Sequence, residues 1–159
     1  MSRVRFRVAV RMAASPEAVF AALTDWPAQA RWIPFTRIRR RPGPRGAVGE
    51  EFSTVSALGP FALRDPMRVT RLDPPLDGRP GRVDLAKTGT VLGGTATIEV
   101  AAEGGGSRVV WTEDLLVRPA PLARAARLGG PLPGLLGRVA FGGVLLRARR
   151  DLERGAVRR

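Results

Sequence analysis

The sequence predicts an α+β fold, in which a seven-stranded antiparallel sheet curves around one long C-terminal helix and two short helices lie between strands 1 and 2. Three observations lead to this prediction. The segment "RVRFRVAVRM" alternates arginine with apolar side chains, as a half-buried strand does. From about 36 to 117, strand-like segments are joined by connections too short for crossover helices, which favours antiparallel hairpins. The remaining C-terminal segment is rich in Ala and Leu at helical spacing.

The N-terminal elements follow from local signals. A strand is predicted over 3–12, with its apolar residues on one face. Ser15 offers a hydroxyl as N-cap and Pro16 suits the first helical position, so a helix begins there. This helix ends at the Asp-Trp-Pro sequence 25–27, and a second short helix is predicted over 28–32.

Six further strands and a helical tail are then expected. The strands lie near 36–41, 47–56, 61–72, 81–88, 94–102 and 107–117, separated by turn sequences such as "RPGPRG" and "EGGGS". In the tail, a helical turn near 121–128, a break at "GGPLPG" and a long helix over about 134–154 are predicted. On or near one side of that helix fall Leu135, Val139, Gly142, Leu145 or Leu146, Arg149 and Leu152.

Composition limits the possible chemistry. The 159 residues are expected to form a single domain, 1–159, large enough to hold a core with a hollow in it. Cysteine, histidine and tyrosine are absent, which excludes disulfides, thiolate nucleophiles, Ser-His pairs and most zinc sites. We expect no metal and no cofactor. The N-terminus does not resemble a signal peptide and no stretch reaches the length of a membrane span, so we expect a cytoplasmic protein.

The formal net charge of +13 has two interpretations. Lys87 is the only lysine among 27 basic residues, so the other 26 are arginine, as the codon bias of a GC-rich genome would produce. The alternative is an adaptor that binds a membrane surface or a nucleic acid through its arginines. No recognisable nucleic-acid motif or set of stacking aromatics accompanies the charge, so we expect no specific nucleic-acid partner.

Four segments resemble a known family. They are "SPEAVFAALTDWPAQARWIP" at 15–34, "GEEF" at 49–52, "RVTRLDPP" at 68–75 and "SRVVWTEDL" at 107–115. Together they resemble the START-like (SRPBCC) superfamily, and within it the polyketide cyclase/dehydrase-like branch, over nearly the whole chain. The resemblance implies a helix-grip fold with a hydrophobic ligand cavity, in a superfamily of lipid carriers, hormone receptors, aromatase/cyclases and oxygenase subunits. The oxygenases need His iron ligands, so that branch is excluded here.

Strand parity predicts a charged cluster inside this cavity. If Trp111 points inward, Glu113 does so too, and the same alternation brings Asp65 and Lys87 inward on their strands. These three residues are the candidate catalytic groups, because a desolvated carboxylate beside an ammonium group can move a proton and polarise a carbonyl. The alternative is that all three are solvated residues at strand ends.

The predicted function is binding or carriage of a small hydrophobic ligand, lipid-like or aromatic, between the sheet and the C-terminal helix. The alternative is a polyketide cyclase/dehydrase-like enzyme that uses a buried carboxylate as acid and base. Trp26 and Trp32 are each interpreted either as a lid over the cavity or as ordinary core packing. Gly142 and Gly143 are expected to let the helix approach the sheet or to leave room for ligand. The candidate ligand-binding residues are Trp32, Phe35, Phe52, Met67, Trp111, Glu113, Phe141 and Leu145. The oligomeric state stays open.

Overall fold

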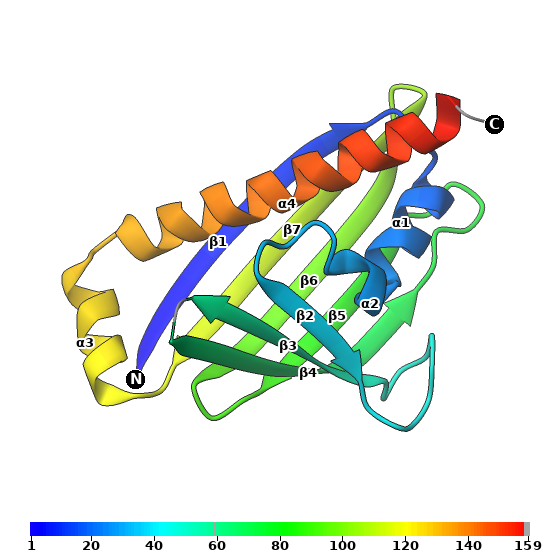
Figure 1. Ribbon diagram of the computed structural model, residues 1–159. Coiled ribbons are helices and arrows are strands. Elements are labelled where there is room, and N and C mark those ends of the chain that lie inside the picture. The colour runs from blue at the N-terminus through cyan, green and yellow to red at the C-terminus, as the bar shows by residue number, and fades with distance from the viewer. Residues whose placement is uncertain (59, 158–159) are drawn as a thin grey trace.

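Seven antiparallel strands form one sheet in the computed structural model, which describes residues 1–58 and 60–157 (Figure 1). The strands are β1 (Ser2–Met12), β2 (Thr36–Arg40), β3 (Glu51–Leu58), β4 (Phe61–Asp73), β5 (Gly81–Thr88), β6 (Leu92–Glu103) and β7 (Gly106–Val117). The helices are α1 (Pro16–Thr24), α2 (Trp26–Gln29), α3 (Ala120–Leu128) and α4 (Leu132–Val157). The predicted helix-grip architecture is confirmed, with α1 and α2 between the first two strands.

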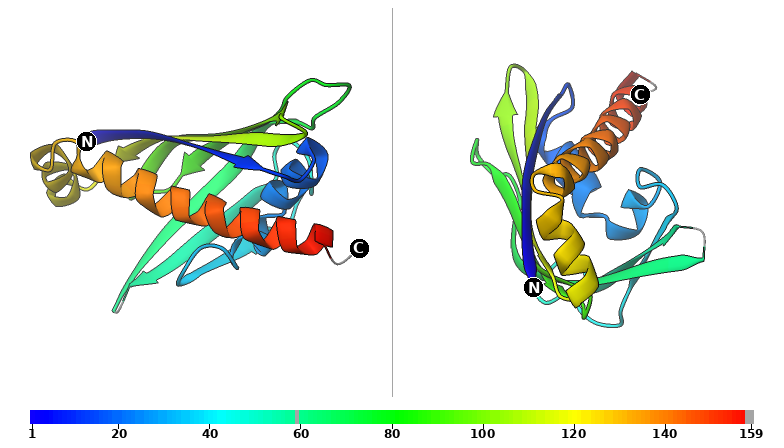
Figure 2. Two further views of the ribbon diagram at one scale, coloured as in Figure 1. Left: turned by 90° about the horizontal axis from the view of Figure 1, so that it is seen from above. Right: turned by 90° about the vertical axis from the view of Figure 1, so that its left-hand side faces the viewer.

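The sheet is strongly curved and α4 lies on its concave side (Figure 2). Its strand order is β1-β7-β6-β5-β4-β3-β2, so the two strands that flank α1 and α2 in sequence form opposite edges. A glycine allows β6 to approach β7 closely: Gly94 has φ +106°, and a Cβ there would lie 1.9 Å from the Asp114 carbonyl oxygen. A register shift between Val69 and Arg71 interrupts the β4–β5 pairing.

The two short helices close one end of the concave face. Ser15 caps α1 by accepting a hydrogen bond from the Ala18 amide, and Pro16 occupies the first turn. The buried residues of α1 are Val19, Phe20 and Leu23. The second helix differs from the prediction, since α2 begins at Trp26 and ends at Gln29. The reason is that Pro27 needs no amide partner in a first turn, so this proline lies inside the second helix.

The boundary of β3 also differs from the prediction. The strand begins at Glu51 and not near 47, because the preceding residues form a turn in which Gly49 has φ +93°. The buried Glu50 closes this turn. Its Oε2 accepts a hydrogen bond of 2.8 Å from the Gly46 amide, and its Oε1 lies 2.9 Å from Nε of Arg40.

The inner side of α4 agrees with the predicted side at Leu145 and Leu152 but not near the start of the helix. Buried residues Val144, Leu145 and Ala148 pack against the core, whereas Leu135 and Val139, on the predicted side, are exposed. The glycine of α4 that is packed tightly against the sheet also lies earlier in the helix than expected. A Cβ at Gly137 would lie 2.4 Å from the Phe6 ring. At Gly142 and Gly143 there is space for a side chain, so neither glycine is needed for the approach.

No single helix among residues 1–58 and 60–157 is long and apolar enough to cross a membrane. Helices α3 and α4 meet the criteria of length and composition only when they are taken together, and they are bent by 94° at the break between them.

Candidate functional site

A cavity of about 200 Å³ lies under the curved sheet, between α2, α4 and the inner faces of β3, β4, β5 and β7. Its lining residues are Trp26, Gln29, Ile33, Thr36, Phe52, Thr54, Ser56, Leu63, Asp65, Met67, Leu85, Lys87, Leu92, Trp111, Glu113, Leu115 and Phe141. Two aromatic pairs make rigid walls. The ring of Trp26 stacks on Phe52 at 4.4 Å, and Phe141 meets Trp111 edge-on at 5.1 Å.

Asp65, Lys87 and Glu113 form a buried charged cluster at one side of this cavity. The Lys87 Nζ donates a hydrogen bond of 2.6 Å to Asp65 Oδ2 and lies 3.4 Å from Glu113 Oε2. Lys87 and Glu113 belong to strands that are not neighbours, since β6 runs between them. Lys87 reaches across because β6 places only Gly94 and Ala96 in the intervening positions.

Two carboxylate oxygens of the cluster accept no hydrogen bond among the described residues. Trp111 Nε1 donates a hydrogen bond of 2.9 Å to Glu113 Oε1, which orients that carboxyl group. Glu113 Oε2 and Asp65 Oδ1 are buried without a hydrogen bond among the described residues. A buried polar atom without a hydrogen bond is costly, so both oxygens are suited to receive a donor from a bound molecule.

The pKa values of Glu113 and Lys87 are both raised, but for different reasons. Burial raises the pKa of Glu113, and the nearby charge of Asp65 adds to the rise, although Lys87 and the Trp111 hydrogen bond oppose it. Burial by itself lowers the pKa of Lys87, but the carboxylates of Glu113 and Asp65 together outweigh it, so that pKa is raised. Lys87 therefore stays charged, and Glu113 is the carboxyl group of this pair that burial makes easier to protonate.

A polar edge continues from the cluster along β2 and β3. Thr36 and Ser56 hydroxyl oxygens lie 2.7 Å apart across these strands, and Thr54 lines the cavity between Ser56 and the apolar wall. Gln29 is buried, and its side-chain amide donates a hydrogen bond to the Leu23 carbonyl. This bond satisfies a backbone acceptor near the C-terminal end of α1.

The predicted charged residues lie together, as strand parity indicated, and five of the predicted ligand-binding residues line the cavity: Phe52, Met67, Trp111, Glu113 and Phe141. Trp32, Phe35 and Leu145 do not line it. Leu145 is fully buried core on α4.

Trp32 fastens the segment after α2 to the C-terminal helix. Its Nε1 donates a hydrogen bond of 2.8 Å to Asp151 Oδ2, and its carbonyl accepts one of 3.0 Å from Arg147. Arg31 lies over the Trp32 ring, 4.9 Å from the centroid. Of the two candidate lid residues, Trp26 therefore forms a cavity wall and Trp32 holds the neighbouring segment in place.

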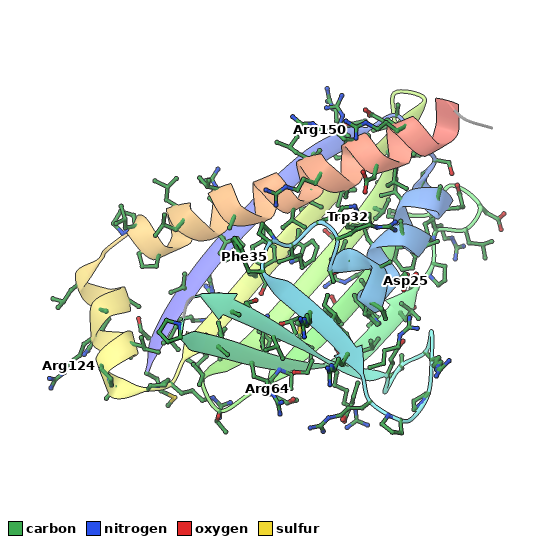
Figure 3. All side chains as sticks on the ribbon, viewed as in Figure 1. Asp25, Trp32, Phe35, Arg64, Arg124 and Arg150 are labelled. Carbon is green, nitrogen blue, oxygen red and sulfur yellow. The ribbon has the colours of Figure 1, made fainter. Side chains whose placement is uncertain are left out.

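Phe35 is 77% exposed, with its backbone in the left-handed region at φ 55°. It lies beside α4, over a groove of about 400 Å³ that is also lined by Val139 and Arg147 (Figure 3). Groove and cavity share the lining residues Ile33, Thr36, Ser56 and Phe141. The groove therefore adjoins the cavity.

Sequence reasoning missed part of the lining. The polar residues Thr54 and Ser56 follow Phe52 at intervals of two along β3. They therefore share its face of the strand, and this period could have placed them on the inner face. Gln29 and Ile33 gave no signal, because they belong to a short helix and a turn without a repeating pattern.

Fold and site together define a helix-grip domain with an internal, mainly apolar cavity and a buried charged cluster. The chain belongs to the family described as polyketide cyclase/dehydrase and lipid transport, which it matches over residues 3–153. The similarity to the START-like superfamily is thereby confirmed. Among curated proteins, none matches this chain in sequence.

Solved structures of similar fold include aromatase/cyclases. The Zhui aromatase/cyclase from Streptomyces sp. R1128 has 19% identity and a TM-score of 0.69, over 94% of this chain and 96% of that chain. The KanY protein has 19% identity and a TM-score of 0.68, over 96% and 99%. The di-domain ARO/CYC StfQ from the steffimycin biosynthetic pathway has 16% identity and a TM-score of 0.67, over 98% of this chain and 52% of that chain. At these identities the likeness establishes the fold.

Proposed function

We propose that the cavity binds a small, mostly apolar molecule that carries a hydroxyl or carbonyl group. The observation that carries this proposal is the pair of buried oxygens without a hydrogen bond among the described residues, Glu113 Oε2 and Asp65 Oδ1, beside the Lys87 ammonium in a mainly apolar cavity. A ligand hydroxyl would donate to one of these oxygens, and a ligand carbonyl would accept from Lys87.

The energetics favour such a ligand over a purely apolar one. Burial of apolar surface contributes about 25 cal/mol per Å². A hydrogen bond to a charged group adds about 1.5–3 kcal/mol. The aromatic walls made by Trp26, Phe52, Trp111 and Phe141 suit a flat ring. A cavity of about 200 Å³ is small, so the ligand would be compact or would extend into the groove beside Phe35.

A pair of probes tests this function. The affinities of 2-naphthol and naphthalene are measured by isothermal titration calorimetry on the wild-type chain. We expect 2-naphthol to bind at least about tenfold more tightly, because only its hydroxyl can donate to the free carboxylate oxygens. In Glu113→Gln this preference should fall, since the amide cannot accept as a charged acceptor does.

The matched control is Asp114→Asn, which removes a carboxylate from the next residue on the opposite face of the sheet. It should leave the preference for 2-naphthol unchanged. Equal affinities of both probes for the wild type, or an equal loss in both variants, would contradict a polar site in the cavity.

Catalysis is the second candidate function, favoured by the raised pKa of Glu113 beside a charged Lys87. In a cyclisation, the Glu113 carboxylate would take a proton from a carbon between two carbonyls, and Lys87 would stabilise the enolate oxygen. The enolate carbon would then form a bond to a second carbonyl carbon, and the new alkoxide would take the proton back from Glu113. No co-reactant is needed.

Exchange of carbon-bound protons tests this second function. The probe is 2-tetralone in D₂O, followed by NMR. If Glu113 acts as a base, the wild-type chain accelerates deuterium uptake over buffer, and Glu113→Gln slows it about 100-fold or more. Uptake at the buffer rate in the wild type would remove the catalytic candidate and leave the binding proposal to the 2-naphthol comparison.

A further inference from the structure

The outer face of α3 and of the first turns of α4 is apolar and uncovered. The inner side of α4 packs on the core, so the opposite side is turned to solvent. The side chains exposed on this surface are Leu122 and Leu128 of α3 and Leu132, Leu135, Leu136, Val139 and Leu146 of α4. We call these seven residues the leucine surface. Leu128 is 89% exposed and Val139 is 68% exposed, which is unusual for side chains of this kind on a water-facing helix.

The charged residues of the same segment are all basic up to Arg150. Between Leu115 and Arg150 there is no Asp or Glu, while seven arginines occur: Arg118, Arg124, Arg127, Arg138, Arg147, Arg149 and Arg150. Arg124, Arg127 and Arg138 are exposed and have no acidic side chain within ion-pair distance among the described residues. Arg124 lies on α3 and Arg150 further along α4 (Figure 3), so basic side chains flank the leucine surface at both ends.

The leucine surface also borders the groove that adjoins the cavity. Val139 lines the groove together with Phe35, the exposed aromatic residue on the other rim. Whatever covers the leucine surface would therefore cover or adjoin this groove.

We propose that the leucine surface and its flanking arginines dock on an anionic lipid bilayer. Leucine side chains enter the boundary between headgroups and acyl chains, while arginine guanidinium groups pair with lipid phosphates and carboxylates. In this orientation the groove beside Phe35 opens toward the bilayer. The docking does not depend on what the cavity binds.

Charge argues against the other occupants of this surface. A second copy of the chain would bring two sets of arginines together without acidic partners, in a protein whose net charge is already +13. A nucleic acid would satisfy the arginines but would leave the leucines in water, because its backbone offers no apolar phase. An anionic bilayer satisfies both kinds of side chain.

Vesicle co-sedimentation tests the proposal with the full chain. We expect binding to phosphatidylcholine–phosphatidylserine vesicles and at least about tenfold weaker binding to phosphatidylcholine alone. Leu128→Ser combined with Leu136→Ser should weaken binding to the anionic vesicles at least about tenfold. The matched control is Leu76→Ser, because Leu76 is 66% exposed in the turn between β4 and β5, outside this surface. This control should bind like the wild type.

A charge series provides the second arm of the test. Arg124→Gln and Arg127→Gln should each weaken binding to the anionic vesicles about fivefold, which corresponds to about 1 kcal/mol per arginine. Arg64→Gln is the control, because Arg64 is exposed on β4 and lies away from α3 (Figure 3).

Three outcomes would overturn the proposal. They are no binding of the wild type to anionic vesicles, an equal loss in Leu76→Ser, and a dimer or DNA complex that the Leu128→Ser and Leu136→Ser changes abolish while vesicle binding persists. Binding of 2-naphthol to the double leucine variant distinguishes the two proposals, because loss of docking alone leaves the cavity intact.

Discussion

Glu113 and Asp114 are adjacent on β7, yet their carboxyl groups behave in opposite ways. Glu113 faces the cavity, where burial raises its pKa. Asp114 faces the outer side of the sheet, where the hydrogen bonds from Arg3 on β1 are the main cause of its lowered pKa. Desolvation opposes them, and a hydrogen bond from Arg5 adds to the lowering. Because successive side chains of a strand point to opposite faces, two adjacent acids can lie in environments that shift their pKa values in opposite directions.

The difference separates an acid that can serve a ligand from an acid that joins two strands. Asp114 accepts from two arginines at 2.6–2.9 Å, so its oxygens are occupied. Among the described residues, only Trp111 donates a hydrogen bond to Glu113, which shares the Lys87 cation with Asp65. One buried cation thus faces two carboxylates, and each of them keeps one oxygen that accepts no hydrogen bond among the described residues.

Removal of the shared cation, Lys87, should have the largest effect on stability. In Lys87→Met, Asp65 and Glu113 remain buried without a positive partner, so we expect the free energy of unfolding to fall by about 3–5 kcal/mol. Urea unfolding followed by tryptophan fluorescence measures this change. Adding Asp65→Asn to Lys87→Met should restore part of the loss, because one uncompensated charge is then gone. A loss of less than about 1 kcal/mol, as for an exposed pair, would contradict a buried cluster.

Removal of the buried acid should change the pH dependence of stability. The folded-state pKa of Glu113 lies above its ordinary value of 4.5, so its contribution to stability is present below pH 4.5 and is lost as pH rises through the raised pKa. In Glu113→Gln that decline is absent. Relative to the wild type, the variant should therefore gain stability as pH rises from 4.5, which urea unfolding over a pH series measures. A constant difference between the two proteins at all pH values would show that the Glu113 pKa is not raised.

Removal of the acid on the outer face, Asp114, should have the smallest effect on stability and the opposite pH dependence. The folded-state pKa of Asp114 lies below 3.8, so its contribution is present above that pH and is lost as pH falls through the lowered pKa. Asp114→Asn should cost about 0.5 kcal/mol near neutral pH, because its arginine partners are largely solvent-exposed. The same unfolding series should show this cost disappearing in acid. A larger cost than in Lys87→Met would reverse the comparison between the two faces of β7.

The charged cluster could be predicted from sequence because it depends on strand parity. Trp111 is bulky enough to indicate the inner face of its strand, and Glu113 follows two residues later. The same period placed Asp65 and Lys87 inward. Their mutual distances could not be predicted, because Lys87 reaches Glu113 only across the small residues that β6 presents between them.

Aromatic residues outside regular strands were predicted less well. Trp32 and Phe35 follow α2 in a turn where no period indicates direction, and one became a buried clasp to Asp151 while the other remained exposed. On α4, the large apolar residues suggested the wrong side for Leu135 and Val139. The helix instead turns Gly137 toward Phe6, because only a residue without a side chain allows that approach.

By itself, the sequence determined the order of the elements, the antiparallel pairing and the inner and outer faces of the strands, because caps, turns and the period of two are local properties. Only the tertiary structure decided which residues enclose the cavity and which side of α4 remains uncovered. The physical reason is that enclosure depends on the curvature of the sheet and on the distance at which α4 packs against it, and both are set by contacts between residues far apart in the chain.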